Sequence, residues 1–213
     1  MTEPVQIKRK RGRPPKAANA RFRDTRKTLL DTGLAILTEK GYSYTGIDEI
    51  LRRAGVPKGS FYHYFDSKEA FGRSLIEAYG HYFACKLERS FQDDTRTPLQ
   101  RLDAFVEDAK AGMKKFGYRR GCLIGNLGQE MSALPEGFRE LLQDVFRDWE
   151  NRLSALLDEA RQAGEIPPHI QCDQIAHFFW IGWEGAVLRA KLDQSQQPLD
   201  QFAQGFRSLL RSA

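Results

Sequence analysis

One glycine, Gly55, and the apolar pattern on either side of it constrain the fold more than any other feature of this chain. Apolar side chains recur at helical spacing over residues 47–54, with Thr45 as a candidate N-cap. Gly55 can take the left-handed conformation that ends a helix. In the short helix expected after it, Phe61 and Phe65 are four residues apart and share a face. The pattern predicts two short helices joined by a tight turn and packed through those rings.

The outward side of the second helix is basic, polar and aromatic. Because both phenylalanines turn inward, the other side chains point to solvent, and Gly59 lets a partner approach the backbone closely. Groups of this kind bind base edges in a DNA major groove or the sugar–phosphate flank beside it. The candidates are Ser60, Tyr62 and His63, with Lys58 beside them. Two helices joined by a glycine turn also occur in all-α proteins that bind no nucleic acid.

The distribution of charge favours DNA binding. Residues 1–65 carry 14 Lys or Arg against 6 Asp or Glu, a net charge of +8, whereas the rest of the chain carries 19 against 22, a net charge of −3. A basic N-terminal third on a mildly acidic body is expected when a nucleic-acid-binding domain is joined to a domain of another kind. We therefore expect the two parts to contact different partners.

A basic stretch at residues 8–16 precedes the first expected helix. It has no apolar periodicity, so we expect residues 1–20 to form a disordered arm. Its Arg-Gly-Arg-Pro core resembles an AT-hook, in which an extended Arg-Gly-Arg lies in a narrow A·T minor groove. Arg11 and Arg13 are therefore candidate DNA contacts. A solubilising tail or a non-specific anchor is the alternative.

The rest of the chain shows helical periodicity and scarcely a strand. A first helix over about 22–40 ends at Gly41 and completes a three-helix head. A further helix starts at Asp66, which is the candidate N-cap, with Glu69 reaching back to it. The predicted fold is all-α, with a helix-turn-helix head at residues 21–66 and a helical effector-binding and dimerisation domain at residues 67–213. Proline and glycine turns separate the remaining expected helices, at 98–116, 122–133, 136–163, 173–192 and 199–211.

Other classes of protein find less support in the sequence. No apolar run approaches the roughly 18 residues that a bilayer span needs, so we expect no membrane contact and a cytoplasmic protein. Cys85, Cys122 and Cys172 are far apart and have no partners at metal-ligand spacing, so we expect reduced thiols, no metal and no cofactor. The sequence contains no phosphate loop or nucleophile elbow. A helical thiol-dependent enzyme built on Cys122 is the competing class.

Several motifs between Thr28 and Tyr79 occur together and in order. They are Gly41-Tyr42, Gly46-Ile47-Asp48-Glu49-Ile50, Ala54-Gly55-Val56, Gly59-Ser60-Phe61-Tyr62-His63-Tyr64-Phe65 and Ser67-Lys68-Glu69. This stretch resembles the DNA-binding domain of TetR-family transcriptional repressors. With Gly121-Cys122-Leu123 and the segment 180–191, it is similar to the subgroup of acrylate-responsive and N-ethylmaleimide-reductase regulators. Many members of the family lack an AT-hook-like arm.

The resemblance implies a homodimer that binds a palindromic operator on double-stranded DNA and is released by a small-molecule effector. Two recognition helices would then enter successive major grooves about 34–36 Å apart. It also implies phosphate contacts from Thr45, Lys58, Tyr64 and Lys68. For Tyr64, a buried ring with its hydroxyl at the surface is an equal alternative. For the whole chain, a non-specific architectural DNA binder held by the basic arm is a further alternative.

Cys122 is the one residue with a candidate chemical role. It follows Arg119, Arg120 and Gly121 at the expected start of a helix, where the helix dipole and two cations would favour a thiolate. In the resembled subgroup the matching cysteine is associated with sensing of electrophiles. The alternative is an inert, buried thiol that packs as a small hydrophobe.

The effector pocket is expected in the body, with an apolar lining and a few convergent polar groups. If the subgroup resemblance holds, Arg120 or Arg189 pairs with a small acrylate-like carboxylate through its planar guanidinium. The candidate pocket residues, together with Cys122, are Arg120, Asn126, Gln129, Trp180, Trp183, Glu184 and Arg189.

Dimer contacts are expected from the helices at 136–163 and 173–192. Gly182, Gly185 and Ala186 are small residues that would permit close approach of a partner helix. The alternative is that they pack inside one subunit.

Overall fold

The computed structural model describes residues 16–212, and within that range it is helical, with no strand. The all-α fold is therefore confirmed. The first helix begins at residue 16, so it includes positions that the sequence assigned to the arm. The helices are α1 Lys16–Lys40, α2 Ile47–Ala54, α3 Lys58–Tyr64, α4 Lys68–Phe91, α5 Pro98–Lys115, α6 Leu123–Gln129, the short 3-10 helix η1 Met131–Ala133, α7 Phe138–Gln162, α8 Cys172–Asp193 and α9 Gln197–Ser212.

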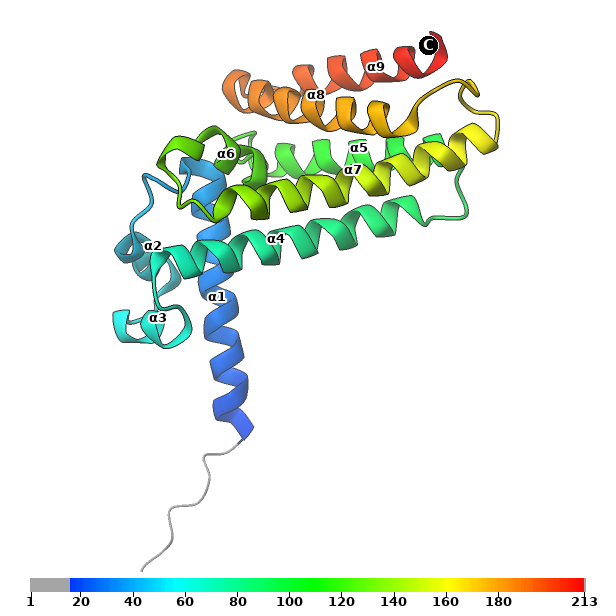
Figure 1. Ribbon diagram of the computed structural model, residues 1–213. Helices are drawn as coiled ribbons and strands as arrows, with labels where there is room; N and C mark the ends of the chain where they lie inside the picture. The colour runs from blue at the N-terminus through cyan, green and yellow to red at the C-terminus, as the bar shows by residue number, and fades with distance from the viewer. Residues whose placement is uncertain (1–15, 213) are drawn as a thin grey trace, which may run out of the picture.

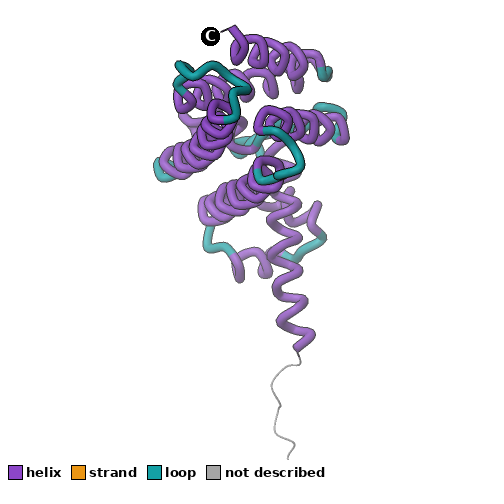
Figure 2. Tube along the Cα trace, turned by 90° about the vertical axis from the view of Figure 1, so that its right-hand side faces the viewer, coloured by secondary structure: helices purple, strands orange, loops and turns teal. Residues whose placement is uncertain are grey.

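The described residues form a small head and a longer body (Figure 1). The head consists of α2 and α3 packed beside α1, and α4 leads from the head into the body. In the body, α7 lies against α4, α5 and α8, and α9 covers α8 (Figures 1 and 2). The end of α1 reaches the body and contacts α6. None of the described helices combines the length and the apolar character needed to cross a bilayer.

The turn between α2 and α3 forms as the sequence predicts. Gly55 has φ 65° and ψ 30°, the left-handed conformation, and the N–H of Val56 donates to the carbonyl of Leu51 at 3.1 Å. Phe61 and Phe65 are buried and meet Phe71 of α4, with ring centroids 5.3 and 4.9 Å apart. Aromatic packing against α4 therefore fixes α3 on the head.

Two predicted helix caps are wrong. Thr45 does not cap α2, because Gly46 occupies that position and the buried Thr45 hydroxyl donates to the Gly41 carbonyl at 2.6 Å. Asp66 does not cap α4, because the hydroxyl of Ser67 accepts the N–H of Ala70 at 3.0 Å. In each case an adjacent residue has the extended backbone that a cap requires.

Aromatic rings from α4, α5, α7 and α8 fill the centre of the body. Trp149 lies between Phe83 and Trp180, with centroid distances of 4.3 and 5.0 Å. Phe105 and Phe179 pack on the same cluster. Both indoles are almost fully buried, and burying each large ring contributes on the order of 2 kcal/mol, which the cost of its buried, unpaired indole N–H partly offsets. Phe83 of this cluster also lines a cavity in the body, so the cluster packs behind one side of that cavity.

Candidate functional site

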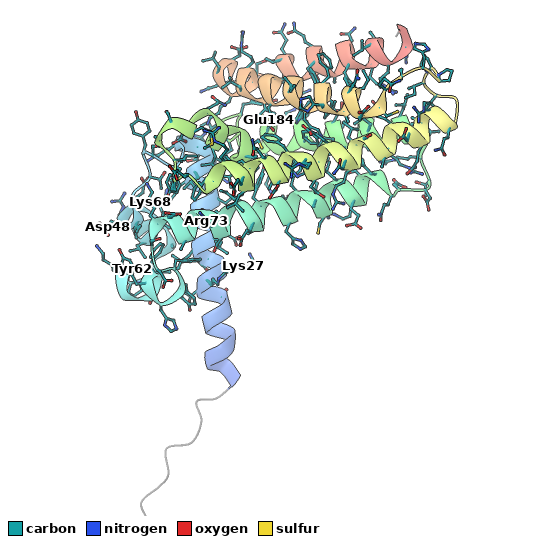
Figure 3. The ribbon with its side chains drawn as sticks, in the orientation of Figure 1. Lys27, Asp48, Tyr62, Lys68, Arg73 and Glu184 are labelled. Atoms are coloured by element: carbon teal, nitrogen blue, oxygen red, sulfur yellow. The ribbon has the colours of Figure 1, made fainter. Side chains whose placement is uncertain are left out.

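The outer side of the head carries the side chains that the sequence analysis expects to contact DNA. Lys58, Gly59, Tyr62 and His63 are exposed on α3, and Ser60 is partly exposed. Figure 3 shows Tyr62 on the side of the head that faces away from the body. Because α3 is held by its buried phenylalanines, these side chains can contact DNA without disturbing the core.

Of the predicted phosphate contacts, Thr45 does not fit the structure. Its side chain is 1% exposed, and its hydroxyl is taken by the Gly41 carbonyl at the end of α1. Lys68 is half-buried: its Nζ donates to the Tyr42 carbonyl at 2.9 Å and lies 4.3 Å from the centre of the Tyr42 ring. Burial lowers the pKa of Lys68. Lys68 therefore stabilises the loop before α2, and its ammonium group is not free at the surface.

The other predicted DNA contacts have mixed surroundings. Lys58 Nζ lies 3.2 Å from a carboxylate oxygen of Asp48, and both side chains are largely exposed, so this ion pair is weak and open to competition by phosphate. Tyr64 is partly buried and packs on the core of the head, which agrees with its alternative interpretation. Arg11 and Arg13 lie outside the described residues.

A cavity of about 320 Å³ lies in the body beside the end of α1. Of the eight predicted effector residues, Arg120, Cys122, Trp183 and Glu184 line it. Lys86, which the sequence analysis missed, lies in the same wall and pairs with Asp108 at 2.7 Å. The remaining lining is mainly apolar and aromatic: Leu34, Thr38, Tyr79, Tyr82, Phe83, Ala109, Gly112, Met113, Phe116, Gly121 and Val187.

The other four predicted effector residues lie elsewhere. Trp180 belongs to the buried aromatic cluster. Asn126 turns away and donates to the Thr38 carbonyl at 2.9 Å. Gln129 is exposed, and Arg189 is exposed beside Asp193, 3.4 Å away, on the surface of α8. These four residues therefore do not line this cavity, although they lie on α6 and α8, and α8 also carries Glu184 and Trp183.

The surroundings of Cys122 contradict the expected thiolate. Cys122 is buried at the N-cap of α6, and the guanidinium of Arg120 is turned toward Glu39, with Nε 3.0 Å from Oε1. Burial and the neighbouring Glu184 raise the pKa of the Cys122 thiol well above its usual range. The backbone N–H of Gly125, in the first turn of α6, acts in the opposite direction but does not reverse the shift. The thiol is therefore protonated at neutral pH.

Glu184 brings an acidic group into the cavity (Figure 3). Its carboxyl group lies directly against Gly125 of α6, where a side chain of any size would collide with it. Burial raises the pKa of Glu184 to about 7, although hydrogen bonding to Cys122 opposes the shift. Near neutral pH the cavity therefore holds a carboxyl group that can donate or accept a hydrogen bond, and its lining also includes the cations Arg120 and Lys86.

An exposed apolar stripe runs along α8. Phe178, Ile181, Leu188 and Leu192 recur at spacings of three, seven and four residues and are exposed, with the open Gly185 between them. Of the other expected small contacts, Gly182 packs against Phe202 of α9, and Ala186 is buried within the subunit. Only part of the predicted dimer surface is thus available to a partner.

A helix-turn-helix head fixed to a helical body with a ligand-sized cavity defines a one-component transcriptional regulator. The chain belongs to the TetR family. Residues 29–74 match the family of bacterial regulatory proteins, tetR family, and residues 98–206 match the tetracyclin repressor-like C-terminal domain. Members of this family typically bind operator DNA as dimers.

Known regulators are similar to this chain over nearly its whole length. The transcriptional regulator AcuR of Cereibacter sphaeroides is 51% identical over 202 residues, which are 95% of this chain and 91% of AcuR. The crystal structure of a regulatory protein TetR from Rhodobacter sphaeroides, also 51% identical, superposes with a TM-score of 0.86 over 86% of this chain and 97% of that one. The reduced form of NemR from E. coli is 32% identical, with a TM-score of 0.80 over 87% and 96%. The predicted family and subgroup are confirmed.

Proposed function

We propose that this protein represses transcription as a homodimer on a palindromic operator and is released by a small acid that binds in the cavity of each subunit. The observation that carries the proposal is the pair of cations, Arg120 and Lys86, in the wall of an otherwise apolar cavity next to the DNA-binding head. A guanidinium binds a carboxylate through a planar, charge-assisted contact, and the apolar walls accommodate the rest of the ligand.

The head is proposed to bind the operator through α3. Tyr62, His63 and Ser60 would contact base edges or the adjacent sugars, with Gly59 allowing close approach and Lys58 leaving Asp48 for phosphate. The basic arm would add minor-groove contacts through its Arg-Gly-Arg sequence. Since the partner is operator DNA, we place the protein in the cytoplasm and assign it no catalytic role.

The apolar stripe on α8 is the proposed dimer contact. An exposed apolar helix face is unfavourable in water, and a second copy of the same face, related by two-fold symmetry, would cover it. The dimer would hold two copies of α3 at the spacing that successive major grooves require.

The proposal is tested with duplex DNA from the region that flanks the gene of this protein, by fluorescence anisotropy at fixed salt. Sodium acrylate should raise the Kd for the duplex by about ten-fold or more, whereas acrylamide, which has nearly the same shape without the charge, should have little effect. Equal effects of the two compounds would show that the cavity does not recognise a carboxylate.

The second candidate mechanism for release of the operator is covalent modification by an electrophile. Mass spectrometry distinguishes it from release by a reversibly bound acid. Because Cys122 is buried and its pKa is raised, N-ethylmaleimide should label the partly exposed Cys85 before Cys122. The Cys122→Ser variant should still respond to acrylate. Faster labelling of Cys122 together with loss of the response in the serine variant would favour covalent sensing instead.

A further inference from the structure

The carboxylate of Glu39, near the end of α1, lies between two guanidinium groups. Arg120 Nε donates to Oε1 of Glu39 at 3.0 Å, and Arg53 Nη1 lies 3.7 Å from Oε2. Arg53 belongs to α2 and precedes the turn at Gly55 by two residues. One carboxylate therefore joins the segment before α6 to the first helix of the helix-turn-helix.

Arg120 belongs to this bridge and to the cavity wall at the same time. Its guanidinium carbon lies 4.1 Å from the centre of the Phe116 ring, and both residues line the cavity. Carboxylates bind guanidinium groups best through paired N–H donors, and the Nε edge of Arg120 is taken by Glu39. An acid that binds this edge from the cavity competes directly with Glu39.

Neighbouring contacts attach the same segment firmly to the head. The Thr38 carbonyl accepts hydrogen bonds from Asn126 Nδ2 at 2.9 Å and from Lys191 Nζ at 3.1 Å. At the other end of α6, the Glu130 carboxylate accepts the N–H groups of Tyr42 and Ser43 at 2.9 and 2.8 Å. Figure 1 shows the end of α1 beside α6. Any displacement of this segment is therefore passed to the junction between α1 and α2.

We propose that Glu39 is the positioning residue that transmits occupancy of the cavity to the DNA-binding head. The inference rests on the function proposed above. When an acid in the cavity draws Arg120 away, Glu39 retains only Arg53, and α2 loses its link through Glu39 to the cavity wall. The angle of α3 on the head is then free to change, and operator affinity falls.

The experiment compares full-length dimers of the wild type, Glu39→Gln and Arg119→Gln. Arg119 is an exposed neighbour of Arg120 and serves as the matched control. Calorimetry measures acrylate binding, and anisotropy measures operator Kd with and without acrylate. Glu39→Gln should bind acrylate at least as tightly as the wild type, yet its acrylate-dependent change in operator Kd should shrink by about five-fold or more. Arg119→Gln should respond as the wild type does, and an undiminished response in Glu39→Gln overturns the proposal.

A ligand-free measurement separates this inference from the function on which it rests. If Arg120 acts through Glu39, adding Arg120→Gln to Glu39→Gln should change neither operator Kd nor amide hydrogen exchange in α2 any further. Arg120→Gln alone should speed that exchange, and Arg119→Gln should not. Additive effects of the two substitutions overturn the proposal. Failure of acrylate to bind the wild type would reject the proposed effector. The comparison of the Glu39→Gln and Arg120→Gln single variants with the double variant would still decide the role of Glu39.

Discussion

At the scale of single residues, the same side chain has a different role according to what surrounds it. Lys58 and Lys68 are both basic residues of the head, yet the first is held by one exposed ion pair and the second by a carbonyl and an aromatic ring. An exposed pair is worth about 0–1 kcal/mol, so phosphate can replace Asp48 at little cost. Displacing Lys68 would also break its contacts with the loop before α2. Of the two, Lys58 is the better candidate for a phosphate contact.

Replacing Tyr62 with Ala should weaken operator binding without loss of stability. The side chain is 49% exposed on α3 and meets the core only through the edge contact with Phe61, so its removal should cost little packing and leave the melting temperature nearly unchanged. The loss of a base or sugar contact should weaken the free energy of operator binding by about 1–3 kcal/mol, which the Kd from anisotropy measures. His81→Ala is the control, because that ring is also exposed, lies on α4 of the body and does not line the cavity. A Tyr62→Ala variant that melts early, or that binds as tightly as the control, would contradict the role in DNA contact.

The raised pKa of Glu184 predicts how stability depends on pH. Because the folded-state pKa of about 7 exceeds the unfolded value of about 4.5, the folded state binds more protons between these pH values, and stability falls as pH rises through this window. The loss is at most about 3 kcal/mol. Glu184→Gln should remove this loss. In urea unfolding at one protein concentration, the free energy of unfolding of the variant relative to that of the wild type should therefore be higher at pH 8 than at pH 5. Glu136→Gln, an exposed control, should show no such difference.

At the scale of secondary-structure elements, short helices depend on their neighbours. Isolated helices shorter than about 12–15 residues are marginal in water, and α3 has 7 residues. Phe61 and Phe65 stabilise it by packing on Phe71, so the recognition helix exists because α4 is present. By contrast, α8 is long and buried on one side, and its exposed apolar stripe is available for another subunit.

Replacing Ile181 with Glu should prevent dimer formation. A charge in the middle of the proposed contact would have to be buried without a partner, which costs several kcal/mol. Sedimentation velocity should show a monomer that keeps its helical circular dichroism and binds the operator much more weakly. Ala111→Glu, on the exposed surface of α5, should leave the dimer intact. A dimeric Ile181→Glu protein would place the contact elsewhere.

At the scale of the whole molecule, the chain has a basic N-terminal third, which is proposed to bind DNA, and an acidic body, which is proposed to bind the ligand. The two parts meet at the junction of α1, α2 and α6, where hydrogen bonds and ion pairs link them. Polar contacts of this kind exchange partners more readily than a packed apolar interface. Such a junction suits a molecule that must switch between two states.

Replacing both Arg11 and Arg13 with Ala tests the arm. If each arginine neutralises a phosphate or lies in the minor groove, the double variant should bind less tightly, and the slope of log K against log salt should become shallower by about one to two units. Preference for the operator over unrelated DNA should be largely kept, because α3 supplies the base contacts. An unchanged slope would exclude the arm from the complex. Anisotropy titrations at four salt concentrations give the slope.

The sequence by itself determined the local structure and the family. Apart from the start of α1, helical spacing located the helices to within a few residues, because periodicity and turn residues act over short distances. Gly55 marked the turn in the head. Tertiary structure decided what each polar group does. Arg120 pairs with Glu39, which is 81 residues away in the sequence. The hydroxyl of Thr45 donates a hydrogen bond to the Gly41 carbonyl, and burial raises the pKa of Cys122. Burial and long-range partners depend on how whole helices pack, which local spacing does not specify.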